Sequence, residues 1–132
     1  MMVKRKKADR GKKILAPTEP KNHDNEHPSF SFKYLLTDYI SCAGHQMTSL
    51  LAKLHNISQL KWKEWKTASR GGIGYEKISR NSLNVGIPRF VPDDVRHFLA
   101  FRFTDGRTVG IRKGTIFYII WIDCELKLYN HE

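Results

Sequence analysis

The stretch HFLAFRFTDGRTVGIRKGTIFYIIWID, residues 97–123, decides the fold of this chain. Its first seven residues, 97–103, have the aromatic and apolar composition of a β-strand. The dipeptide Asp105-Gly106 follows, and these residue types tolerate the positive φ angles of a tight hairpin turn. Residues 107–112 then run back as a partner strand, so the stretch begins with a predicted β-hairpin.

The second half of the stretch predicts further strands. Lys113-Gly114 is a second turn, and residues 115–123 are apolar on both faces, which is typical of a central, covered strand. After one more short turn, residues 126–131 are the last predicted strand. We therefore expect an antiparallel meander of three to four strands in the last third of the chain.

The chain ahead of the meander predicts one strand and two helices. Residues 29–36 are rich in aromatic residues and alternate at first, which indicates a strand. The apolar residues of the first predicted helix fall at the spacing of one helical face: Met47, Leu50, Leu51, Leu54 and Ile57. Ser58 can cap a second helix that buries Trp65, while Trp62, flanked by lysines, has base stacking as an alternative role. A strand, two helices and a meander predict an α+β domain with both helices packed on one face of the sheet.

Residues 70–96, between the helices and the meander, form a long and irregular segment that contains glycine and proline. Long loops in compact domains often carry function. Lys77 and Arg89 in this segment extend a predicted phosphate-binding track, although a solvated loop is an equally good interpretation.

The charge of the chain points to a polyanionic partner. There are 23 Lys and Arg against 13 Asp and Glu, a formal net charge of +10. The net charge is +6 in residues 1–13, −2 in residues 14–28 and +6 in residues 29–132. Basic charge in excess attracts phosphates through counterion release and steering. Residues 1–28 predict a disordered tail that is basic and contains proline, and residues 29–132 a single domain.

The cysteines and the apolar runs bear on the compartment. Cys42 and Cys124 are too few for a disulfide framework and favour a reducing environment. No apolar run approaches the ~20 residues of a membrane span, and none follows the basic N-terminal run as in a secretory signal. We expect a soluble, cytoplasmic protein without a membrane partner.

Alternation along the strands assigns side chains to two faces. The Leu, Phe and Val side chains of the meander, such as Phe101, Phe103 and Val109, are expected to face the helices. The opposite face should then present basic, hydroxyl and imidazole groups, those of Arg102, Arg112, Lys127, Tyr129 and His131.

These residue types match the needs of metal-free RNA cleavage. His131 can act as a general acid or base, Tyr129 can stack on a base or donate a hydrogen bond, and Arg112 can neutralise the scissile phosphate. We predict these three as catalytic residues, with an ordinary exposed sheet face as the alternative. The residues predicted to bind flanking phosphates are Arg102, Arg107, Lys113, Lys127, Lys77 and Arg89.

The order of elements, with Val-Gly-Ile-Arg112 and Leu-Tyr129-Asn-His131 on a basic sheet, resembles the RelE/ParE superfamily of toxins. The RelE, HigB and YoeB types are the most similar branch. The resemblance implies an endoribonuclease that cleaves mRNA on the ribosome without a metal or another cofactor. It also implies a cognate antitoxin that neutralises the basic face.

Other functions remain open. A non-catalytic RNA- or ribosome-binding module could use the same basic face and tail. A DNA-binding protein has less support, because no helix-turn-helix pattern is present. Cys42 with His45, or His23 with His27, provides at most half of a zinc site, so no metal is predicted.

Overall fold

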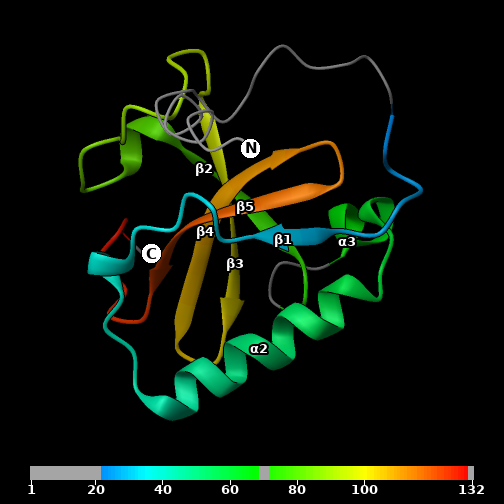
Figure 1. The fold of residues 1–132 in the computed structure, drawn as a ribbon, viewed down its shortest axis with the longest axis horizontal. Helices are drawn as coiled ribbons and strands as arrows, with labels where there is room; N and C mark the ends of the chain where they lie inside the picture. The colour runs from blue at the N-terminus through cyan, green and yellow to red at the C-terminus, as the bar shows by residue number, and fades with distance from the viewer. Residues whose placement is uncertain (1–21, 69–71, 131–132) are drawn as a thin grey trace, which may run out of the picture.

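The computed structural model describes residues 22–68 and 72–130. Their elements, in chain order, are β1 (Ser29–Ser31), the 3-10 helix η1 (Thr37–Tyr39), α2 (Gly44–Ser58), α3 (Trp62–Thr67), β2 (Tyr75–Ser79), the 3-10 helix η2 (Arg80–Ser82), β3 (His97–Phe103), β4 (Gly106–Lys113) and β5 (Ile116–Asp123) (Figure 1). The five strands form one mixed sheet in the order β1-β5-β4-β3-β2. β1 runs parallel to β5, and the other neighbouring strands are antiparallel. The predicted α+β class, with one strand and two helices ahead of antiparallel strands, is confirmed.

Two strand predictions are wrong. The segment predicted to be irregular contains β2, which pairs with β3 along its whole length, from Tyr75 opposite Phe101 to Ser79 opposite His97. The predicted last strand is absent from the described residues that it would include, where a single bridge joins Leu83 to Tyr129. The fourth antiparallel strand therefore comes from before the hairpin rather than after it.

One face of the sheet packs against the helices. This helix-side core consists of Leu50, Leu54, Ile57, Trp62, Trp65, Phe101, Phe103, Phe117, Ile119 and Ile122. Three of the five predicted α2 residues belong to it, because the buried stripe of the helix is narrow and leaves Leu51 63% exposed. Both tryptophans are fully buried, so the alternative role of Trp62 in base stacking is wrong.

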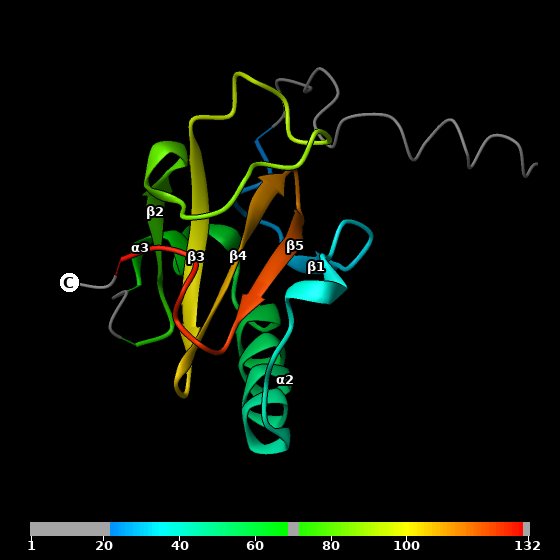
Figure 2. The ribbon, with the colours of Figure 1, turned by 90° about the vertical axis from the view of Figure 1, so that its left-hand side faces the viewer.

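The other face carries a second apolar core. This loop-side core consists of Ile78, Val91, Phe98, Ala100, Val109, Ile111, Ile120, Trp121, Leu128 and Tyr129. Figure 2 shows what covers it: the long segment between β2 and β3 (yellow-green) runs across the end of the sheet, and the C-terminal segment (red) crosses the strands. Because both faces are covered, the prediction of one apolar and one open basic face is wrong.

The register of the sheet explains the two cores. Val109 lies opposite Ala100 rather than opposite Phe101, so it faces away from the helices. Between Val109 and Gly110 the pairing with β5 shifts by a residue, which places Ile120 and Trp121 on the same side. A bulge of this kind lets two successive residues share one face.

Residues 22–28, which the sequence assigns to a tail, pack onto the start of α3. The backbone N–H of Trp62 donates to the Glu26 carbonyl (2.8 Å), and that of Lys63 donates to the Asp24 carbonyl (2.9 Å). These bonds satisfy amides that a helix start leaves without partners. Ser58 is the last residue of α2 and does not cap α3, whose N-cap residue is Lys61. The predictions for residues 1–21 lie outside the described residues.

Cys42 and Cys124 form a disulfide, with Cα atoms 5.3 Å apart and a sequence separation of 82. It joins the segment before α2 to the end of β5. The expectation of two reduced thiols is therefore wrong, because the fold brings together two cysteines that the sequence keeps far apart. In the described part of the chain, no helix is long and apolar enough to cross a membrane.

Candidate functional site

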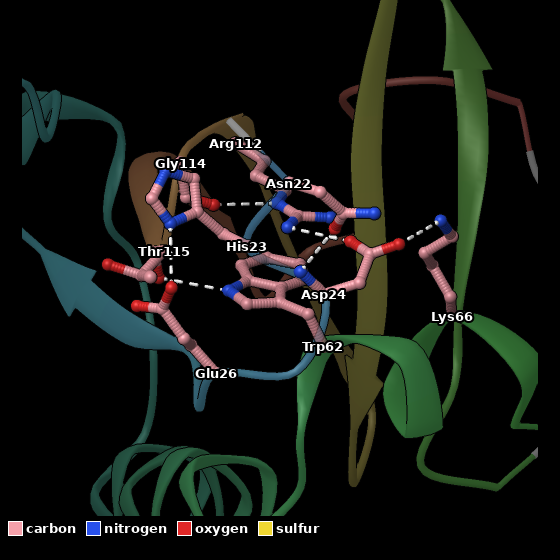
Figure 3. Close-up of polar contacts among 9 residues, drawn as sticks. All are labelled: Asn22, His23, Asp24, Glu26, Trp62, Lys66, Arg112, Gly114 and Thr115. Atoms are coloured by element: carbon pink, nitrogen blue, oxygen red, sulfur yellow. Dashed lines mark hydrogen bonds and ion pairs between the residues drawn. The ribbon is translucent and has the colours of Figure 1, made fainter. Parts of the chain in front are cut away.

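Arg112 lies on the helix side of the sheet and not on the predicted basic face. Its guanidinium stacks over the Trp62 ring, 3.9 Å from the ring centroid. Its Nε donates to the Gly114 carbonyl (2.8 Å), and its Nη2 donates to Asp24 Oδ1 (3.0 Å), as Figure 3 shows. The predicted location beside Tyr129 is wrong, because Arg112 alternates with the buried Ile111 of the loop-side core.

Asp24 is the centre of this group. Its carboxylate accepts from Lys66 Nζ (2.8 Å) as well as from Arg112, and its side chain is 26% exposed (Figure 3). The hydrogen bonds from Lys66 and Arg112 hold the pKa of Asp24 below its ordinary value. Both cations are paired with this one carboxylate, so the arrangement fastens the N-terminal segment to α3 and β4.

The loop side of the sheet brings other predicted residues together. Arg102 on β3 lies directly opposite Arg107 on β4, and both are next to the hairpin turn. The Tyr129 hydroxyl donates to Glu76 Oε2 (3.4 Å), and Arg107 lies close enough to influence the pKa of Tyr129. We call Glu76, Arg102, Arg107 and Tyr129 the Tyr129 cluster.

Tyr129 is the buried member of the cluster. Only 6% of its surface is exposed, and burial, with the charge of Glu76, raises its pKa to about 12. It is therefore protonated at neutral pH and can donate a hydrogen bond but cannot act as a base. Within the cluster, the Tyr129 hydroxyl therefore serves as a hydrogen-bond donor, with Glu76 as its acceptor.

The C-terminal segment holds Tyr129 in position. The buried carboxylate of Asp123 accepts from the backbone amides of Lys127 (3.0 Å) and Leu128 (2.9 Å). The backbone N–H of Asn84 donates to the Leu128 carbonyl (2.7 Å), and the side-chain amide of Asn84 donates to the Lys127 carbonyl (3.1 Å). These bonds replace the strand pairing that the sequence predicts for this segment.

The two arginines present positive charge at the surface. Arg102 is exposed, and Arg107 is half-buried with its Nη1 donating to the Gly106 carbonyl (3.0 Å). The Nε of Arg107 is buried and has no hydrogen-bond partner among the described residues. Like charges directly opposite each other in a sheet destabilise it, so an anion at this point would relieve their repulsion.

The remaining predicted residues are dispersed. Lys77 on β2 and Arg89 in the loop before β3 are exposed, and Lys127 is exposed but paired with Glu125 (3.1 Å). Lys113 is half-buried at the end of β4. His131 lies outside the described residues, so its predicted role stays a prediction.

Sequence reasoning missed Glu76 as a member of the cluster. It is the acidic residue of the basic segment 70–80, and its position on the same face as Tyr129 depends on the pairing of β2 with β3. Once β2 is recognised, the alternation Tyr75-Glu76-Lys77 places Glu76 on the side away from Tyr75, which packs on the helix-side core.

Three of the four candidate zinc ligands have other partners. Cys42 is in the disulfide, His23 Nδ1 is 3.0 Å from Glu26 Oε2, and His27 Nδ1 is 2.8 Å from the Leu60 carbonyl. Within residues 22–68 and 72–130, no three potential metal ligands lie together. Comparison with protein-family models, with curated proteins and with solved structures finds no match for this chain.

Proposed function

We propose that this protein binds RNA through the exposed cations around the Tyr129 cluster and does not need to cleave it. The observation that carries the proposal is the cross-strand pair of Arg102 and Arg107, two cations that lie directly opposite each other in the sheet, with Arg102 exposed. A guanidinium offers several N–H groups in a fixed plane, which suits a phosphate. A phosphate bound beside the two side chains would offset their like charges.

Exposed cations elsewhere on the molecule add to its general attraction for a polyanion. Seven exposed basic residues make no ion pair with a described residue: Lys33, Lys61, Lys63, Lys77, Arg89, Arg96 and Arg102. Because the chain as a whole carries +10, a polyanion gains from long-range attraction before any of these groups makes contact.

A binding role fits the predicted catalytic residues better than cleavage does. Arg112 is committed to Asp24 and Trp62, and Tyr129 is buried with its proton held. Two of the three predicted catalytic groups are therefore used by the fold, whereas most of the predicted phosphate-binding groups are exposed.

The test measures the affinity of the full chain for a fluorescein-labelled RNA by anisotropy over a range of salt concentrations. Arg102→Ala should weaken binding and reduce the slope of log K against log salt by about one. Lys63→Ala is the matched control, because it removes the same charge from an exposed residue of α3 on the other side of the sheet. Equal effects of the two variants, or binding that ignores salt, would contradict the proposal.

A RelE-like endoribonuclease that cuts mRNA on the ribosome is the second candidate. It is favoured by the contact of Tyr129 with Glu76, beside Arg107, since a carboxylate, a protonated hydroxyl and a guanidinium are groups that can move a proton and hold a phosphate. Arg107 then takes the phosphate-binding role that the sequence assigns to Arg112. The resemblance also implies a cognate antitoxin, which should carry acidic residues for this surface.

Growth after tightly controlled expression in bacteria distinguishes the two candidates. The endoribonuclease predicts arrest by the wild type and recovery with His131→Ala or Tyr129→Phe. Tyr129→Phe keeps the buried ring, so recovery with normal protein levels assigns the effect to the hydroxyl. Binding of RNA without arrest leaves the non-catalytic function as the one supported.

A further inference from the structure

Three aromatic side chains that do not belong to the Tyr129 cluster gather on the loop side of the sheet. The Tyr34 ring lies 4.9 Å from the Phe90 ring and 5.5 Å from the Tyr118 ring, measured between centroids. All three are partly exposed where they pack against the loop-side core. We call Tyr34, Phe90 and Tyr118 the aromatic platform.

The platform is built on fixed supports. Phe90 lies in a turn closed by the Val91 amide, which donates to the Pro88 carbonyl (3.0 Å), and Val91 itself is buried. The guanidinium of Arg80 donates to the carbonyls of Pro92 (2.9 Å) and Val95 (2.8 Å) and so ties down the rest of this loop. These hydrogen bonds therefore fix the loop and, with it, the position of Phe90.

Cations accompany the rings. Lys33 Nζ lies 5.3 Å from the centroid of the Tyr34 ring, and Arg89, next to Phe90, is exposed with no ion pair to a described residue. Partly exposed rings beside unpaired cations can stack on bases while the cations bind the backbone phosphates.

We propose that the aromatic platform, with Lys33 and Arg89, is a binding surface for single-stranded RNA. This inference rests on the proposed RNA-binding function and names the form of RNA that it recognises. In a duplex the faces of the bases are stacked on one another and cannot reach Tyr34 or Phe90, so only an unpaired strand gains from these rings.

The experiment compares two labelled probes, a 20-nucleotide oligouridylate and a 20-base-pair RNA duplex, in anisotropy titrations of the full chain. The variant Tyr34→Leu/Phe90→Leu replaces the rings with apolar side chains that still cover the loop-side core. Phe32→Leu is the matched control, because Phe32 is 50% exposed and makes no ring contact with a described residue. Circular dichroism melts establish that each variant is folded.

The expected result is a loss of about fivefold or more in affinity of the double variant for the oligouridylate, with affinity for the duplex unchanged. Phe32→Leu should bind both probes as the wild type does. If the wild type binds the oligouridylate and the folded double variant binds it equally well, the platform proposal is overturned and the proposed function stands. If the wild type binds neither probe, the proposed function itself fails.

Discussion

Gly110 shows how one residue can control the whole sheet. A Cβ atom built at this position overlaps the backbone carbonyl of Tyr118 and comes within 2.8 Å of the Phe117 ring. Neither group can move easily, because Tyr118 belongs to the paired strand β5 and Phe117 is fully buried. Glycine is needed here for close approach of two strands at the bulge, and not for a turn.

We therefore predict that Gly110→Ala lowers the free energy of unfolding by about 1–3 kcal/mol, the typical range of overpacking in a core. Chemical denaturation of the purified variant measures this loss. Gly86→Ala is the control, because a Cβ atom there meets nothing within 4 Å. If the Gly110→Ala protein were as stable as the Gly86→Ala protein, β4 and β5 could move apart to admit the methyl group without a loss of stability.

A second prediction at the residue scale concerns Asp24. Its pKa in the folded state is lower than the ordinary value of 3.8, so its ion pairs stabilise the fold above that pH and lose this effect as pH falls through the folded pKa. Asp24→Asn should cost about 1 kcal/mol at pH 7 and progressively less below pH 4. Denaturation at several pH values tests this, with the exposed Asp94→Asn as control. A loss that is the same at pH 7 and pH 3 would mean that the charge of Asp24 is not what matters.

At the scale of elements, the C-terminal segment depends on a side chain rather than on a strand ladder. Asp123→Ala removes the acceptor of two backbone amides, those of Lys127 and Leu128, and leaves them buried or half-buried without partners. We predict a loss of about 2–3 kcal/mol and faster hydrogen exchange at both amides. Glu125→Ala, which breaks only exposed contacts with Lys127 and Ser41, should leave exchange unchanged. Protection that survives in Asp123→Ala would indicate that Asn84 alone holds the segment.

The sequence predicts elements better than it predicts faces. The spacing of Leu50, Leu54 and Ile57 and the two turns around β4 are local signals, and α2 and the hairpin follow from them. The sequence predicts the wrong face for Val109, because apolar character shows only that a residue is buried. In a sheet covered on both sides, it does not show which core buries the residue.

The candidate site was harder to predict than the fold for the same reason. Arg102, Arg107 and Tyr129 were all selected for their chemistry, and they do come together. The sequence predicts the wrong face for Arg112, because it takes the side of Val109 and Ile111 to be the one that faces the helices. Glu76 was missed since its place depends on β2, a short strand in a segment with no clear alternation.

At the scale of the whole molecule, the disulfide is the longest constraint. Cys42 and Cys124 are 82 positions apart, and the bond ties the start of α2 to the end of β5, where Asp123 anchors the C-terminal segment. A loop of this length restricts the unfolded chain strongly, so the bond should stabilise the fold by about 2–4 kcal/mol. Both sulfur-bearing residues are partly exposed, which lets a reductant reach them.

We predict that reduction of the protein with TCEP lowers the melting temperature by about 10 °C, as measured by circular dichroism. The double variant Cys42→Ser/Cys124→Ser should melt at the lower temperature whether or not TCEP is present, which separates loss of the bond from other effects of the reagent. Thiol titration of the native, untreated protein should detect no reactive cysteine. Two reactive thiols in protein prepared under oxidising conditions would contradict the bond. That result would instead support the reducing environment that the cysteine content predicts. A reduced form that stays folded would instead show that the fold persists in either environment.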